Sequence, residues 1–165
     1  MKLSPKKHKF LYFTFLLVSF LGFLDASYLT VKHFVGTPLP CSVLRGCEEV
    51  TTSQYSVIGG IPVAMLGAIY YLAIFILILT VLRRNMFSSS NVGNIAVTNE
   101  DKLLNLTARL TIIGLLASLW FIYLQLFVIK AICLYCMFSA FTSITLFVFG
   151  LFVLNFGKKI IVERG

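Results

Sequence analysis

Charged side chains are scarce in this chain. Only 12% of its 165 residues are Asp, Glu, Lys or Arg, whereas 59% are hydrophobic, and the mean hydropathy is +0.95. In soluble globular domains about a quarter of the residues are charged. The composition therefore excludes an ordinary soluble domain and indicates an integral membrane protein.

Long polar stretches are also lacking. A run of about 20 apolar residues crosses the hydrocarbon core of a bilayer as a helix. Four such runs can be marked, at residues 10–31, 61–82, 110–129 and 133–156. Loops over 32–60 and 83–109 and a short outer turn over 130–132 separate them, which leaves almost nothing for a soluble domain. We therefore predict a single membrane domain over residues 1–165, an all-α bundle of four transmembrane helices.

Acidic residues are few as well. There are six of them against 14 Lys and Arg, so the net charge is +8. In a soluble protein this excess would suggest a nucleic-acid partner, but here the basic residues flank the apolar runs, mainly at both chain ends and in the loop over 83–109. The positive-inside rule places these flanks in the cytoplasm. We therefore predict cytoplasmic termini, an outer loop over 32–60 and no nucleic-acid partner.

Within that cytoplasmic loop, residues 85–100 are rich in Ser and Asn and lack apolar periodicity. Such a segment is typical of an irregular connection. We predict a flexible loop there.

A single acid, Asp25, lies inside an apolar run. A carboxylate in lipid costs about 2.5 to 3.5 kcal/mol on insertion scales, so Asp25 either faces the bundle interior, where it would line a site or carry a proton, or sits at the interface and pairs with Lys32 or water. His33, at the same end of the run, is either a metal ligand or proton donor, or an interfacial residue. The interfacial role is the commoner one.

Only four cysteines are present, and all lie on the predicted outer side. Cys133 and Cys136 form a Cys-x-x-Cys where the fourth run begins. Free N–H groups and the positive end of the helix dipole stabilise a thiolate in the first turn of a helix, and the thiolate is the reactive form in disulfide exchange. Disulfides persist in an oxidising outer compartment. Taken alone, the motif also fits half of a zinc site or two small buried hydrophobes.

The other two cysteines, Cys41 and Cys47, lie in the outer loop. Pro38, Pro40 and Gly46 indicate an irregular segment around them. A disulfide that closes so short a loop removes little chain entropy, adds little stability and exchanges readily. The spacing therefore favours a shuttle pair over a structural disulfide.

Polar residues follow this pair before the second run begins. Ser53 and Ser56 either donate hydrogen bonds to a ligand at the membrane surface or act as ordinary capping and loop residues. The next residues, Gly59 and Gly60, form a glycine-rich connection, and Pro62 fits the first turn of the second span.

A soft-metal site is the alternative function that the cysteines allow. Four thiolates, from Cys41, Cys47, Cys133 and Cys136, suit a tetrahedral site, with His33 as a further ligand. A tetrathiolate on the outer side would compete with oxidation, however, and would leave the polar stretch from Ser53 onward unexplained. We therefore favour redox chemistry and expect no metal.

Together, these motifs resemble the vitamin K epoxide reductase (VKOR) family, and specifically its bacterial and archaeal members. The likeness covers nearly the whole chain: four spans, a spaced cysteine pair in the first outer loop, Ser53 six residues after Cys47, and a Cys-x-x-Cys that opens the fourth span. The most distinctive stretch includes Gly60-Ile61-Pro62, Gly67 and Tyr70-Tyr71. At Gly59 this chain departs from the family, whose members more often carry an aromatic residue there. In the DsbB family the two cysteine pairs come in the opposite order.

The resemblance implies a membrane enzyme that oxidises protein dithiols with a quinone as acceptor. By resemblance, Cys41 would form the mixed disulfide with a reduced partner, Cys47 would pass the electrons to Cys133, and Cys136 would be the thiolate beside the quinone. Ser53 would hydrogen-bond a quinone oxygen. The quinone would be of the ubiquinone, menaquinone or vitamin K type.

The resemblance also implies a partner and a location. Many bacterial members carry a fused thioredoxin-like domain and none fits in this chain, so we expect a separate thioredoxin-fold (DsbA-like) protein. The location implied is the cytoplasmic (inner) membrane, with the cysteines facing the periplasm or the cell exterior and a membrane quinone pool at hand.

Overall fold

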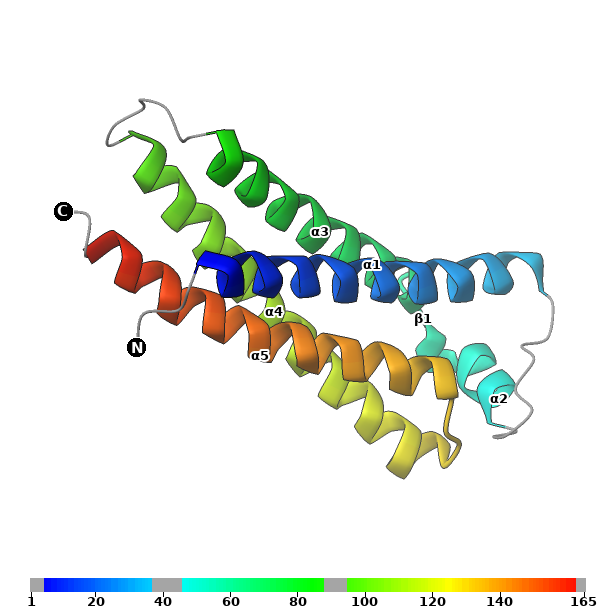
Figure 1. The fold of residues 1–165 in the computed structure, drawn as a ribbon. Helices are drawn as coiled ribbons and strands as arrows, with labels where there is room; N and C mark the ends of the chain where they lie inside the picture. The colour runs from blue at the N-terminus through cyan, green and yellow to red at the C-terminus, as the bar shows by residue number, and fades with distance from the viewer. Residues whose placement is uncertain (1–4, 37–45, 88–94, 163–165) are drawn as a thin grey trace.

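A computed structural model describes residues 5–36, 46–87 and 95–162. The four long helices are α1 (Pro5–Val35), α3 (Val63–Phe87), α4 (Ile95–Tyr123) and α5 (Leu134–Val162). The shorter elements are α2 (Cys47–Thr52), the 3-10 turn η1 (Gln54–Ser56), strands β1 (Val57–Ile58) and β2 (Ile61–Pro62), and the π-helical turn η2 (Leu124–Ile129), which continues α4. The long helices form an elongated bundle, with α2 at the end opposite the first turn of α1 and the last turn of α5 (Figure 1).

Each long helix contains an apolar segment that could cross a membrane. These segments are Phe10–Val35, Val63–Arg83, Asn105–Ile129 and Leu134–Phe152. Most of their large side chains point outward, such as Phe141, which is 68% exposed. Lipid tails are as apolar as these side chains, so this exposure carries no hydrophobic cost in a bilayer. The predicted four-helix membrane fold is thus confirmed.

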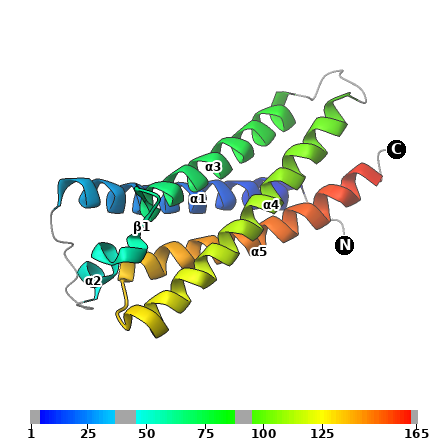
Figure 2. The ribbon, with the colours of Figure 1, turned by 180° about the vertical axis from the view of Figure 1, so that it is seen from behind.

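The helices pack in an uneven pattern. α1 packs mainly against α3, α4 mainly against α5, and α1 also contacts α5. Seen from behind, α4 crosses α5, and its first turn lies near the last turn of α3 (Figure 2). The main core lies where α1, α3 and α5 meet, and its buried members are Phe15, Ala26, Tyr71, Ile74, Ile78 and Leu146.

Tyr71 links α3 to α5 through this core. Its side chain is 2% exposed, and its hydroxyl donates to the carbonyl oxygen of Ser139 at 2.7 Å. The same hydroxyl lies 3.1 Å from Oγ of Ser139 and 2.9 Å from Oγ1 of Thr142. A membrane interior offers no water to replace such bonds. The Tyr71 hydroxyl therefore fixes how α3 and α5 sit against each other.

A short hairpin precedes α3. Val57 lies opposite Pro62 and Ile58 opposite Ile61 in an antiparallel pair. Gly59 and Gly60 form the two-residue turn with φ of +58° and +83°, values that suit the hairpin turn and that glycine adopts without strain. The prediction that Pro62 lies in the first turn of the second span is wrong, because strand pairing holds Pro62 in β2 and α3 begins at Val63.

The middle of the chain is more helical than predicted. The flexible loop expected over 85–100 is wrong for two parts of that range, since α3 continues to Phe87 and α4 begins at Ile95. Residues 88–94 lie outside the described residues. Once a helix is nucleated, each further residue adds a hydrogen bond at little cost. Both helices therefore extend beyond the apolar segments that anchor them.

A substitution at Gly22 can test the contact between α1 and α3. A Cβ at Gly22 would lie 2.5 Å from Cε1 of Tyr71, whereas a Cβ at Gly67 would meet only Ala26, at 3.6 Å. We expect Gly22→Ala to lower the thermal unfolding temperature in detergent, with a loss of about 1 to 3 kcal/mol, because overpacking displaces a hydrogen-bonded ring. Gly67→Ala is the matched control and should change it little. Equal unfolding temperatures for the two variants would contradict this packing.

Candidate functional site

The Cys-x-x-Cys lies at the beginning of α5, as predicted. Cys133 immediately precedes the helix, and its carbonyl oxygen accepts a hydrogen bond from the N–H of Met137 at 3.0 Å, while Cys136 lies in the first turn. Lys130, in the left-handed conformation with φ +55°, turns the chain between η2 and α5. The short connection holds both thiols at the end of the helical hairpin.

Gln125 positions this connection, and the sequence analysis missed it. Its side chain is 2% exposed, and its Oε1 accepts a hydrogen bond from the backbone N–H of Cys133 at 3.0 Å. Its backbone oxygen accepts from the N–H of Ala131 at 3.1 Å. One signal was available: an amide side chain in an apolar run needs a buried partner.

Cys133 packs against the outer loop. It forms a small buried cluster with Cys47, Val50 and Ala131, in which Cys133 is 0% and Cys47 is 1% exposed. The backbones come close here, since a Cβ at Gly46 would lie 2.7 Å from the backbone nitrogen of Ile132. Glycine at this position therefore lets the first turn of α2 rest on the turn before α5. The structure thus brings Cys47 next to Cys133, while Cys41 lies outside the described residues.

The cysteines differ in redox state. Cys47 takes part in a disulfide, whereas Cys133 and Cys136 are free thiols. A hydrogen bond from the Cys136 side chain lowers the pKa of Cys133 to about 7. The backbone N–H groups of Cys136 and Tyr135 also contribute to this lowered pKa, while burial opposes them. A pKa near 7 gives Cys133 thiolate character at neutral pH, and the thiolate is the form that reacts in disulfide exchange.

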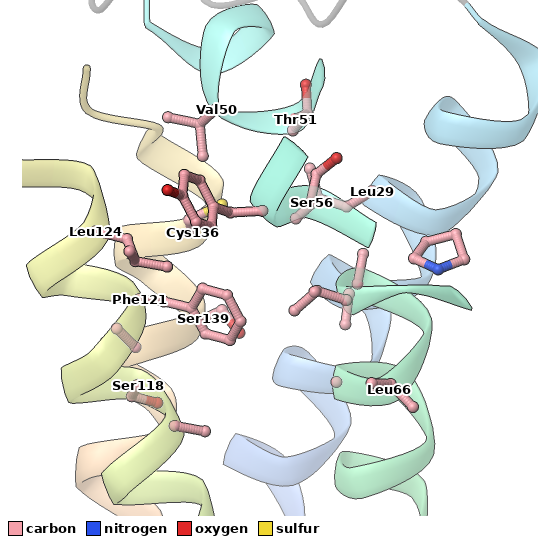
Figure 3. Close-up of a pocket in the computed structure, with 18 of the residues that line it drawn as sticks. Leu29, Val50, Thr51, Ser56, Leu66, Ser118, Phe121, Leu124, Cys136 and Ser139 are labelled. Atoms are coloured by element: carbon pink, nitrogen blue, oxygen red, sulfur yellow. The ribbon is translucent and has the colours of Figure 1, made fainter. Parts of the chain in front are cut away.

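A cavity of about 410 Å³ opens beside Cys136. It lies between α4 and α5 on one side and α1 and α3 on the other, with α2 and η1 above it (Figure 3). Cys136 lines this cavity, as do Phe121, Leu124 and Leu66, but Cys133 does not. Its size and its mostly apolar lining are typical of a site for a small hydrophobic ligand. The two thiols thus meet different surroundings.

Ser53 and Ser56 also line the cavity. The Ser53 hydroxyl donates to the carbonyl oxygen of Val50 at 2.8 Å, and the Ser56 hydroxyl donates to the carbonyl oxygen of Ser53 at 2.7 Å. Both alternatives from the sequence therefore have support, because the two serines stabilise the loop and also border the cavity. To donate to a ligand, the Ser53 hydroxyl would have to exchange its bond to Val50.

Asp25 lies toward the interior on α1. Its Oδ2 is buried and has no hydrogen-bond partner within residues 5–36, 46–87 and 95–162. Lys32 lies instead over the ring of Tyr28, with Nζ 5.8 Å from the ring centroid. The Asp25 carboxylate is close enough to interact electrostatically with Cys133 and Cys136. These contacts support the interior location over pairing with Lys32.

The positions of His33 and the cysteines can be compared with what a metal site would require. His33 is exposed at the end of α1, with its ring edge on Phe34 at a centroid distance of 5.8 Å, as expected of an interfacial residue. Among the described residues, no three His, Cys, Asp or Glu side chains gather into a possible metal site. In a disulfide, Cys47 also lacks the thiolate that a zinc site requires.

The fold and the site define a membrane protein of four helices, with a reduced thiol pair held between a disulfide-bonded loop and an apolar cavity. The chain belongs to the vitamin K epoxide reductase family, because the sequence model of that family matches residues 13–151. This match confirms the resemblance inferred from the motifs.

Among curated proteins, the chain is similar to "Thiol-disulfide oxidoreductase LTO1" of Arabidopsis thaliana. The two are 32% identical over 127 residues, which cover 75% of this chain and 31% of that protein. The chain thus spans about a third of the length of this relative.

The hydrogen bond between the two thiols can be tested by titration. In a variant with Ala at positions 41 and 47, Cys136→Ala should raise the pKa of Cys133 from about 7 toward the ordinary 9.0, because the donor is lost. The ultraviolet absorbance of the thiolate against pH measures this shift. Cys136→Ser is the control, since its hydroxyl still donates and should keep the midpoint low.

In the same titration, Asp25→Asn should lower the pKa of Cys133, which is opposite to the effect of Cys136→Ala. The Asp25 carboxylate raises the pKa of Cys133, so its neutralisation should lower the midpoint. A midpoint that does not change in Cys136→Ala would contradict the assigned role of the thiol hydrogen bond.

Proposed function

We propose that the protein is a quinone-dependent thiol–disulfide oxidoreductase that reoxidises a thioredoxin-fold partner and so drives disulfide formation. One observation carries the proposal: Cys133 packs against the disulfide-bonded Cys47, while Cys136, three residues later, lines an apolar cavity. With Cys133 beside the loop and Cys136 at the cavity, the α5 cysteines can pass electrons from the reduced loop pair to a hydrophobic acceptor. The similarity to a protein named as a thiol–disulfide oxidoreductase supports thiol–disulfide exchange as the chemistry.

The outer half of the reaction is thiol exchange. A partner thiolate attacks Cys41 of the loop disulfide, and the second partner thiol then resolves the mixed disulfide. The partner leaves as a disulfide, and Cys41 and Cys47 are left as thiols. Two electrons and two protons have then entered the protein.

The inner half passes these electrons onward. The Cys47 thiolate attacks Cys133 of the oxidised Cys-x-x-Cys, and Cys136 leaves as a thiolate at the wall of the cavity. Cys41 then resolves the Cys47–Cys133 disulfide, so the loop is oxidised again and Cys133 and Cys136 form the reduced pair.

The cavity suits a quinone ring. Its lining is largely apolar, it reaches Cys136, and Ser53 stands at its rim. A bound quinone would supply a two-electron acceptor at Cys136. The chain itself excludes water with α1, α3, α4 and α5, holds the thiolate and orients the ring. Over one cycle, a partner dithiol becomes a disulfide and a quinone becomes a quinol, with two electrons and two protons transferred.

Partner and location follow from the same reasoning. The loop disulfide needs a soluble dithiol that reaches the membrane surface, for which a separate thioredoxin-fold protein is suited. The basic residues at both chain ends and around the 83–109 loop favour cytoplasmic termini. The cysteines would then face the periplasm or the cell exterior from the cytoplasmic membrane, where an oxidised loop persists.

The order of the relay can be tested with Cys41→Ala. Without Cys41, the intermediate cannot be resolved, so oxidation with a short-chain ubiquinone should trap a Cys47–Cys133 disulfide and leave Cys136 as a free thiol. Peptide mapping by mass spectrometry identifies the pair. The double variant Cys41→Ala, Cys133→Ala should trap no such species. If all four thiols of the unmodified protein instead stay reduced with quinone, and zinc copurifies in stoichiometric amount, the proposal fails and the metal site replaces it.

Gly46 allows a second test of the contact between the loop and α5. A side chain there would collide with the backbone of Ile132, so Gly46→Ala should push α2 away from Cys133. We expect transfer between the loop pair and the α5 pair to slow by about 10- to 100-fold, since small displacements of reacting groups cost rates of this order. Acid quenching followed by thiol alkylation measures the transfer.

Glu49→Ala is the control for Gly46→Ala, because Glu49 lies on the same short helix and is exposed. It should leave the transfer rate unchanged. Equal rates for the two variants would show that the close contact at Gly46 does not govern the transfer.

A further inference from the structure

Two neighbouring hydroxyls on the cavity wall lack hydrogen bonds of good geometry among the described residues. Tyr70 on α3 and Ser143 on α5 both line the cavity. The Tyr70 hydroxyl and Oγ of Ser143 are buried and close enough to interact with each other, but neither makes a hydrogen bond of good geometry among the described residues. The neighbouring Tyr71 hydroxyl, in contrast, is fully satisfied by Ser139 and Thr142. The two poorly bonded hydroxyls are therefore ones that line the cavity.

Both hydroxyls converge on Gly114 of α4. A Cβ at Gly114 would overlap the Tyr70 hydroxyl and lie 2.9 Å from Oγ of Ser143. The absence of a side chain on α4 thus leaves room for the two oxygens at one place in the cavity. Gly114 is a small residue in the third apolar run, and its role here is to make room for two polar groups.

The position along α5 relates these hydroxyls to the reactive thiol. Cys136, Ser139 and Ser143 are spaced by three and seven residues, so they share one helix face. Seven residues rise roughly 10 Å along a helix. The Ser139 hydroxyl lies within hydrogen-bond distance of Tyr71, so Ser143 is the next polar group on this face. A six-membered ring with a polar atom at each end, together with its contacts, fits between Cys136 and Ser143.

Two buried hydroxyls that face each other can share only one hydrogen bond, so at least one O–H lacks an acceptor. Burying a hydroxyl without a partner is unfavourable, and each such case in a folded protein calls for an explanation. Acyl chains of lipids offer no acceptor, whereas a carbonyl oxygen has two lone pairs and can accept from both hydroxyls. The ligand chemistry that fits is therefore a flat ring with a carbonyl at the end remote from Cys136.

We infer that Tyr70 and Ser143 form a second polar subsite, which binds the carbonyl oxygen of the quinone that points away from Cys136. The inference rests on the proposed function and deepens it. The two hydroxyls donate, the carbonyl accepts, and the ring is held at both ends. The subsite thereby selects ligands with two opposed carbonyls over hydrocarbons of the same shape.

The test measures ligand affinity on the oxidised, full-length protein in detergent. The probe is 2,3-dimethyl-1,4-naphthoquinone, which has both carbonyls and no free ring position for thiol addition, and calorimetric titration gives its Kd. We expect Tyr70→Phe and Ser143→Ala each to weaken binding about 3- to 10-fold, and the double variant about 10- to 100-fold. Binding of 2,3-dimethylnaphthalene, which has no carbonyl, should be equal in all variants.

Two further measurements separate ligand binding from a structural role. Without ligand, the double variant should unfold at the same or a higher temperature than the unmodified protein, because an unpaired hydroxyl stabilises nothing. Transfer from the loop pair to Cys133 should also keep its rate. Tyr123→Phe and Ser19→Ala are the matched controls, since Tyr123 is exposed on α4 and the Ser19 hydroxyl bonds the carbonyl oxygen of Leu16.

The possible failures are distinguishable. If the unmodified protein binds the naphthoquinone and the double variant binds it within twofold, the subsite is refuted and the proposed function stands. Weaker binding together with a lower unfolding temperature without ligand would assign the hydroxyls to helix packing and also refute it. If the unmodified protein does not bind the naphthoquinone, the quinone acceptor of the proposed function fails, and the subsite fails with it.

Discussion

The hydrogen bond from the N–H of Cys133 to Oε1 of Gln125 is the contact on which the site depends. Cys133 precedes the first residue of α5, so its N–H has no acceptor within the helix. At the end of a membrane bundle, a buried N–H left without a partner would be costly. Gln125, from the π-helical turn that ends the preceding helix, supplies the acceptor. The thiol pair is thereby tied to the α4–α5 hairpin and not to a mobile loop.

Once Cys133 is held in place, the two thiols of α5 contact different parts of the molecule. Gly46 lets the first turn of α2 approach the turn before α5, which buries Cys47 beside Cys133. One helical turn later, Cys136 faces the cavity between α3, α4 and α5. The thiol hydrogen bond also makes the pair asymmetric, because Cys136 donates and Cys133 carries the thiolate character. Because the two cysteines are three residues apart at the start of one helix, Cys133 can exchange with the loop while Cys136 contacts a hydrophobic acceptor.

Much of this organisation could be predicted from the sequence because it depends on composition and spacing. Apolar runs define membrane helices without reference to their neighbours, and the Cys-x-x-Cys places two sulfurs at a helix start by local geometry alone. Contacts between distant segments could not be predicted in this way. Gln125 is eight residues from Cys133, Tyr71 reaches Ser139 across the bundle, and Gly46 meets Ile132 only in the folded chain. Pro62 was misplaced for the same reason, since its strand partner overrides its preference for a helix start.

The unsatisfied polar atoms gather around this same region. Within the described residues the buried side-chain atoms without a hydrogen-bond partner are Oδ2 of Asp25, the Tyr70 hydroxyl and Oγ of Ser143. Two of these border the cavity, and the Asp25 carboxylate interacts with both cysteines of α5. A bundle selected only for stability would fill such positions with apolar residues, because polar groups inside a membrane are expensive and concentrate at functional sites. These atoms therefore lower the stability of the bundle in one region, which is the region around the reduced thiol pair and its cavity. We interpret this cost as a sign of function.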